Sequence, residues 1–201
     1  MLALRPSTRC HCAGFTMVEL IMVMVLAGIL SAVAGSRFFD KRVYEARAFS
    51  DQAAALIRYA QKLAIAQNRP VFVRSTPTGF AVCFDAGAAC ATPADLAQAP
   101  GGTNNGTAAT RAFCVNGANS LYVANWACLG RPPASIAIAS PVARNEMAAN
   151  GFFWFDAAGR PYNSGDAPTT RVSTFTRLTL NFASGSEQAS INIEAETGYV
   201  F

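Results

Sequence analysis

An apolar segment near the amino terminus constrains this chain more than any other feature of its sequence. The twenty residues 15–34 are apolar except for Thr16, Glu19 and Ser31. A helix that crosses a bilayer needs about 20 predominantly apolar residues, so the length of this segment suits a membrane span. A carboxylate inside such a span costs about 2.5–3.5 kcal/mol on insertion scales, and we therefore expect Glu19 to have a specific use or partner.

One interpretation of this segment is a secretory signal peptide. Arg5 and Arg9 would supply the positive region, the apolar run would supply the apolar region, and Ala32–Ala34 (AVA) would be a cleavage site with small residues. This interpretation removes the segment from the mature protein and gives Glu19 no role.

The second interpretation takes account of the sequence beyond Ala34. Apolar residues continue at steps of three and four, which predicts an amphipathic helix, and Pro70 ends the pattern. We therefore expect one helix from Phe15 to Gln67, about 80 Å long at ~1.5 Å per residue. The apolar positions of its second half are Phe39, Val43, Ala46, Phe49, Ala53, Leu56, Ala60 and Leu63.

The sequence GFTMVEL followed by an apolar run resembles the type III signal of type IV prepilins and type II secretion pseudopilins. In that family a prepilin peptidase cleaves after the glycine, here Gly14, and methylates the new amino terminus, here Phe15. The glutamate of the motif matches Glu19. The resemblance implies that Glu19 pairs with the charged amine of a neighbouring subunit's Phe15, which offsets the burial of both charges in a filament. This explains Glu19, and we favour it over the signal peptide.

The resemblance also implies a division of the chain. Residues 1–14 would be the leader peptide, 15–36 the transmembrane half of the helix, 37–68 its amphipathic half, and 70–201 a globular domain. Many members of the family have a proline in the second half of the apolar segment, where the helix loosens in filaments. This chain has Gly35–Ser36 there instead.

The cysteines indicate an oxidising compartment. Two of the six precede the apolar segment, and the other four follow it in the globular part. Four cysteines beyond a membrane-directing segment predict two disulfides. Three pairings exist in principle, and we favour the pairing of neighbours. Spacings of C-x6-C and C-x13-C, with no histidine after them, are not typical of a zinc site. The four candidates are Cys83, Cys90, Cys114 and Cys128.

The globular part reads as short β-strands. VFVRS and GFAVCF, joined by TPTG, predict a hairpin, and SLYVANW, SIAIAS, FFWFD, RLTLNFA and ASINIEAETGYVF are further β-prone runs. Residues 86–117 are rich in Ala, Gly, Asn and Thr and predict a long surface excursion. The fold class expected is α+β and pilin-like, with the long helix packed on a small antiparallel β-sandwich.

Two further segments narrow the resemblance. FWFDAAGRPYNSGD and INIEAETGYVF are similar to segments of the secretion pathway protein H and FimT group of minor pilins, and SAVAGSRFFD makes the chain most like minor pilins of mannose-sensitive haemagglutinin (MSHA) type pili. The resemblance implies a minor pilin that supports pilus biogenesis and adhesion. Its partners would be other major and minor pilins, the prepilin peptidase and the inner-membrane assembly platform. It would reside in the bacterial inner membrane, with its globular domain periplasmic, and then in an extracellular pilus. The alternatives are a minor pseudopilin of type II secretion and a DNA-uptake minor pilin of the FimT type.

Ligand-binding interpretations are weaker. Asp156, Asn163 and Asp166 have oxygen atoms that suit calcium, but the same residues are ordinary turn formers. Arg171 and Arg177, with Phe175 between them, would suit phosphates and bases, although alternating arginines are common on the solvent face of a strand. The formal charge of +4 and the lack of any basic run do not favour nucleic acid as a partner.

Nothing in the sequence indicates an enzyme. The one histidine, His11, lies in the predicted leader, and no nucleophile elbow, phosphate loop or zinc motif occurs. We therefore expect no catalytic residues, no cofactor and no metal.

Overall fold

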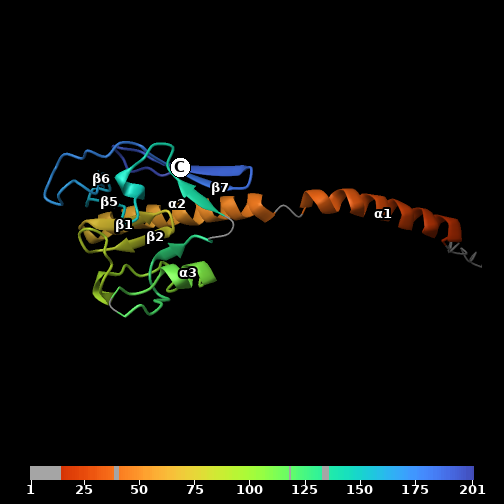
Figure 1. The fold of residues 1–201 in the computed structure, drawn as a ribbon, viewed down its shortest axis with the longest axis horizontal. Coiled ribbons are helices and arrows are strands. Elements are labelled where there is room, and N and C mark those ends of the chain that lie inside the picture. Colours follow the sequence, from red (N-terminus) through yellow and green to blue (C-terminus); the bar gives the residue numbers. More distant parts are fainter. Residues whose placement is uncertain (1–14, 39–40, 118, 133–135) are drawn as a thin grey trace, which may run out of the picture. The chain divides into compact units, whose positions relative to one another are not determined.

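The computed structural model describes residues 15–38, 41–117, 119–132 and 136–201. It divides the chain into two units, Met1–Lys41 and Arg42–Phe201, and each is described by itself (Figure 1).

The first unit contains helix α1, Met17–Phe38. Its backbone is helical through Gly35–Ser36. The side chains from Phe15 to Ser31 are all exposed, and nearly all of them are apolar. The expected continuity between this helix and the next falls on residues 39–40, which lie outside the described residues, as does the apolar position Phe39.

Within the part of the chain that the structure describes, no helix combines the length and hydropathy needed to cross a membrane.

Helix α2, Lys41–Gln67, is amphipathic, as the sequence predicts. Of the expected apolar positions whose side chains the structure describes, four are buried and two, Leu56 and Leu63, are half-buried. The side chain of Val43 is not among those described. Ile57 and Ala64 are fully buried. The buried face is therefore centred on these residues at these two turns, rather than on the expected Leu56 and Leu63. The buried residues of α2 are Ala46, Phe49, Ser50, Ala53, Ala54, Ile57, Ala60 and Ala64.

The chain leaves α2 through Asn68, which has a φ of 51°. Its N–H donates to Ile65 O, and the N–H of Arg69 donates to Ala64 O, so two of the last four carbonyl groups of the helix have partners. Pro70 cannot extend the helix, and the first strand begins at the next residue.

The strands form two antiparallel sheets. The larger sheet has the order β3-β2-β1-β5-β6, and the smaller has the order β4-β7-β8. The larger consists of β1 (Val71–Thr76), β2 (Gly79–Cys83), β3 (Cys128–Gly130), β5 (Phe152–Phe155) and β6 (Pro161–Asn163). The smaller consists of β4 (Ala137–Ala139), β7 (Leu178–Ser184) and β8 (Glu187–Ile193).

Helix α2 and the inner faces of both sheets share one apolar core. In Figure 1 the helix runs alongside β1 and β2 and also alongside β7. Alternation along the strands sends every second side chain inward, so Val71 and Val73 of β1 and Phe153 and Phe155 of β5 lie in this core. The expected α+β fold, with a helix packed on antiparallel strands, is confirmed.

Two side chains of α2 also hold the carboxyl-terminal segment. Arg58 donates from Nε and Nη2 to Val200 O, at 3.0 and 2.9 Å. Gln61 donates from Nε2 to Gly159 O and to Thr197 O, both at 2.8 Å. The end of the chain is thereby fixed to the middle of the helix.

The outer face of the larger sheet is covered as well. Cys83 and Ala81 of β2 pack there with Leu96 and Trp126, and the indole N–H of Trp126 donates to Val82 O at 2.8 Å. The covering segment includes α3, Ala108–Phe113, and a 3-10 turn, Pro93–Asp95.

This segment corrects two expectations. Residues 86–117 are not only a surface excursion, because buried Cys90, Leu96 and Cys114 belong to the core of this face. The β-prone run SLYVANW, residues 120–126, forms no strand. It makes isolated bridges at Tyr122 and Trp126 instead.

The shared core predicts a contrast between two isoleucines of α2. Ile57→Ala should lower the free energy of unfolding by about 2–5 kcal/mol, because Ile57 is fully buried and the substitution leaves a cavity. Ile65→Ala, the matched control, should cost about 1 kcal/mol or less, because Ile65 is 51% exposed. Urea denaturation of the detergent-solubilised full chain measures both. Similar losses for the two variants would contradict this packing of α2.

Candidate functional site

The amino-terminal site is built around the first turn of α1. Thr16 precedes the helix, and its Oγ1 accepts a hydrogen bond from the backbone N–H of Glu19 at 3.2 Å. The N–H of Leu20 donates to Thr16 O at 3.1 Å. Thr16 therefore caps α1, and the spacing Thr-x-x-Glu is that of a capping box. This role of Thr16 is absent from our sequence-based expectations, although the spacing would have revealed it.

Glu19 is exposed in this first turn, where the partial positive charge of a helix amino terminus stabilises a carboxylate by about 0.3–1 kcal/mol. Glu19 forms no ion pair with any other described residue of the chain. Phe15, the residue expected to become the methylated amino terminus, is 77% exposed. Gly14 lies outside the described residues.

The four cysteines of the globular unit form two disulfides, Cys83–Cys90 and Cys114–Cys128. The Cα atoms are 5.5 Å apart in the first and 5.9 Å apart in the second, within the usual range. This is the pairing of sequence neighbours. Both disulfides belong to the cluster that covers the outer face of the larger sheet.

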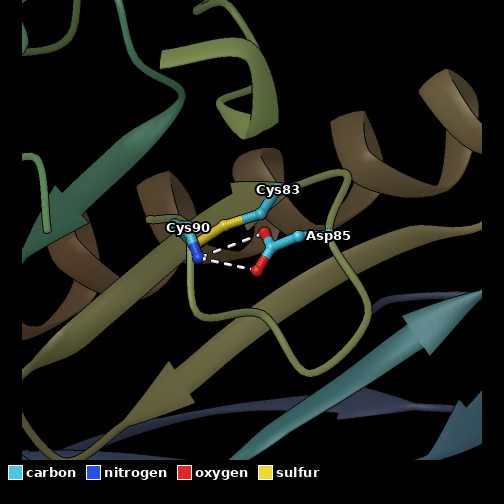
Figure 2. Close-up of side chains that lie close together, drawn as sticks. All are labelled: Cys83, Asp85 and Cys90. Atoms are coloured by element: carbon cyan, nitrogen blue, oxygen red, sulfur yellow. Dashed lines mark hydrogen bonds between the residues drawn. A yellow bond between two sulfur atoms is a disulfide. The ribbon is translucent and has the colours of Figure 1, made fainter. Parts of the chain in front are cut away.

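In the Cys83–Cys90 loop, the carboxylate of Asp85 lies beside the disulfide that closes the loop (Figure 2). Both oxygens of Asp85 accept from the backbone N–H of Cys90, at 3.1 and 3.0 Å. Arg74 of β1 donates from Nε to Ala88 O at 2.9 Å. Burial lowers the pKa of Arg74, and the negative charge of Asp85 opposes that shift.

The carboxylates considered as calcium ligands accept hydrogen bonds from backbone N–H groups of the turns in which they lie. Asp156 Oδ1 accepts from the N–H groups of Ala158 and Arg160, at 2.9 and 2.8 Å. Burial, and then the charge of Asp156, raise the pKa of Tyr162. A metal site of this kind needs at least three acidic, cysteine or histidine side chains close together. Among the described residues, neither Asp156 nor Asp166 belongs to such a group.

Asp166 closes the turn that follows β6. Its Oδ2 accepts from Asn163 N–H at 2.9 Å and Thr174 N–H at 3.0 Å, and its Oδ1 accepts from the Thr174 hydroxyl at 2.7 Å. Burial on its own would raise the pKa of Asp166, but these hydrogen bonds to its ionised form outweigh that effect and the pKa is lowered.

The residues considered for phosphate and base contacts are not all available at the surface. Phe175 is only 5% exposed and packs against Phe153, with ring centroids 5.8 Å apart, so it is not available for stacking on a base. Arg177 pairs with Glu194, with Nη2 and Oε1 2.6 Å apart, while Arg171 is exposed.

A family model described as the prokaryotic N-terminal methylation motif matches residues 9–35. This range includes the predicted cleavage site, Phe15 and Glu19. The chain therefore carries a prepilin-type amino terminus, as the sequence predicts. No curated protein sequence matches the chain significantly.

Among solved structures, two crystal forms of the type IV minor pilin FimU of Pseudomonas aeruginosa (strain PAO1) are similar to this chain. The first is 12% identical with a TM-score of 0.44 and covers 80% of this chain and 90% of that chain. The second is 11% identical with a TM-score of 0.41 and covers 77% of this chain and 90% of that chain. Scores this low do not by themselves establish a common fold, and the α+β assignment rests on the elements described above.

The contacts of Asp166 predict a pH-dependent contribution to stability. Because its pKa in the folded protein lies below the unfolded value of about 3.9, the contribution is present above that pH and is lost as the pH falls through the folded pKa. Asp166→Asn should lower the free energy of unfolding by about 1–3 kcal/mol at pH 7 and by progressively less below pH ~4. Urea denaturation across this range measures the difference, with Asp51→Asn on the exposed face of α2 as the control. A loss that did not change with pH would contradict the role assigned to the ionised carboxylate.

Proposed function

We propose that this chain is a minor pilin, made as a prepilin, cleaved after Gly14, methylated at Phe15 and assembled into a thin filament. The observation that carries the proposal is the methylation motif over residues 9–35. A peptidase that cleaves and methylates there, other pilins and an inner-membrane assembly platform are the partners that this implies.

The exposed surface of α1 supports a role in assembly. Large apolar side chains from Phe15 to Leu30 are at least half exposed. A helix that is apolar on all sides needs an apolar environment around it. We propose that lipid provides this environment for residues 15–36 before assembly, and that the corresponding helices of neighbouring subunits provide it afterwards.

The globular unit supports a destination outside the cytoplasm. Its two disulfides are typical of an oxidising compartment. We propose a periplasmic position for this unit before assembly and an extracellular one afterwards.

Within this class, we propose that the chain is a minor pilin of MSHA-type pili similar to minor pilin C, with a role in biogenesis and adhesion. The support is the sequence resemblance of SAVAGSRFFD and FWFDAAGRPYNSGD. A minor pseudopilin of type II secretion is the second candidate. The DNA-uptake role is less favoured, because Phe175 is buried and Arg177 is paired with Glu194.

The proposal predicts a specific defect for Glu19→Ala. The Thr16 hydroxyl bonds to the backbone N–H of Glu19, so the cap of α1 survives the substitution. Membrane insertion and cleavage should continue. Incorporation should fail, because the amine of a neighbour's Phe15 would be buried without its partner, at a cost of about 3–5 kcal/mol.

The measurement is the subunit content of sheared filaments relative to the membrane pool. Glu19→Gln should give an intermediate value, since it keeps an acceptor and loses the charge. Glu45→Ala, which removes an exposed carboxylate from α2, is the control and should assemble normally. Assembly of Glu19→Ala at the wild-type level would show that Glu19 is not an assembly residue here.

A further inference from the structure

The Cys83–Cys90 loop brings three potential ligand atoms together. The sulfur atoms of Cys83 and Cys90 and a carboxylate oxygen of Asp85 all lie within 4.8 Å of one another (Figure 2). Among the residues that the structure describes, this is the one such group of three. No described residue places a carboxylate in a comparable position beside the Cys114–Cys128 pair, which therefore serves as an internal control.

Contacts other than the disulfide hold this loop in place. Asp85 accepts from Cys90 N–H with both oxygens. Arg74 donates to the carbonyl oxygens of Ala88 and Ala89. Next to Cys83, Phe84 N–H donates to the backbone oxygen of Asp95, the last residue of the 3-10 turn, at 2.8 Å. Breaking the sulfur–sulfur bond therefore leaves the three side chains beside one another.

The backbone of the loop explains why the spacing C-x6-C does not look like a metal site in the sequence. Ala88 and Cys90 have φ values of 52° and 51°, in the left-handed region. These residues turn the chain back, so that Cys90 returns to Cys83 with Asp85 beside both. The sequence gives the spacing of the cysteines but not this reversal.

We propose that the reduced chain binds a thiophilic divalent cation of the Zn²⁺ class through Sγ of Cys83, Sγ of Cys90 and a carboxylate oxygen of Asp85. Thiolate sulfur and carboxylate oxygen are both Zn²⁺ ligands. Two thiols and one M²⁺ give a metal dithiolate and two protons, which leave to solvent, so no oxidant or reductant takes part in binding.

The charges of the site support a divalent ion. Two thiolates and the Asp85 carboxylate carry three negative charges. A bound divalent cation neutralises two of these charges, so one negative charge remains. Arg74, whose guanidinium holds the same loop, offsets the remaining charge. Both cysteines are buried, whereas Asp85 is half-buried, so solvent and the ion reach the site from the side of Asp85.

The proposal goes beyond the assembly function and does not depend on it. A chain that has just entered an oxidising compartment still has free thiols. A metal bound at this loop would mask Cys83 and Cys90 and delay formation of their disulfide, while Cys114 and Cys128 oxidise freely.

The test uses the full chain with Cys10→Ser and Cys12→Ser, because free Cys10 and Cys12 beside His11 would bind cobalt themselves. This chain is kept in detergent, reduced with a phosphine, desalted without oxygen and titrated with Co²⁺. Thiolate-to-cobalt charge-transfer absorption should appear with about one Co²⁺ per chain, and Zn²⁺ should abolish it by displacement. Cys83→Ser with Cys90→Ser should remove the band, and Cys114→Ser with Cys128→Ser should leave it unchanged. Asp85→Asn, whose amide oxygen still accepts from Cys90 N–H, should weaken binding by about tenfold or more, the range found even for groups that only support a ligand.

Several results would overturn the proposal. They are the absence of the band, its survival in the Cys83/Cys90 double variant, its dependence on Cys114 and Cys128, and equal affinity of the oxidised chain. The proposal would also be overturned if reduction abolished the near-ultraviolet circular dichroism and added metal did not restore it. That result would show that the reduced loop does not hold the three ligands together. As a second readout, peptide mass mapping should show that Zn²⁺ slows oxidation of Cys83–Cys90 and not of Cys114–Cys128.

Discussion

Burial of one face of α2 is the contact on which the globular unit depends. The same helix forms a wall of the core for both sheets, so the inner side chains of β1, β5, β7 and β8 leave water only when the helix is in place. Small residues at Ala53, Ala60 and Ala64 let the helix backbone approach the strands closely, and Ile57 fills the space between them. The polar contacts of Arg58 and Gln61 then attach the carboxyl-terminal segment to the same helix.

The outer face of the larger sheet is protected in a different way. The segment between β2 and β3 is rich in alanine and has few large apolar side chains for its length. It covers that face with Trp126, Leu96 and the two disulfides. A crosslink stabilises such a segment because it restricts the unfolded chain, by about 3 kcal/mol for a loop of ~15 residues. The shorter crosslinked loop, Cys83–Cys90, carries Asp85, so the candidate metal site is a consequence of how this face is closed.

Much of the fold is visible in the sequence. The three- and four-residue steps of α2 and the hairpin of β1 and β2 are local patterns, and the structure has both. By contrast, β3 and β6 are three residues long and exist because a neighbouring strand pairs with them, which local composition does not encode. The run SLYVANW has strand-forming residues, but tertiary packing uses Trp126 to cover β2 instead.

The residues proposed to have a function divide in the same way. Glu19 and the glycine–aromatic junction at Gly14 and Phe15 can be recognised in the sequence because they belong to one short, continuous motif. Thr16 was accessible to the same reasoning. The grouping of Asp85 with Cys83 and Cys90 was not, because it requires a backbone reversal through left-handed residues.

The most direct test of the account is the amino terminus of the chain recovered from membranes. Mass spectrometry of the amino-terminal peptide should identify N-methylated Phe15, which follows from cleavage at Gly14 and from the methylation motif over residues 9–35. A mature chain that begins at Gly35, as a signal peptidase would leave it, or one that still begins at Met1, would contradict the pilin assignment.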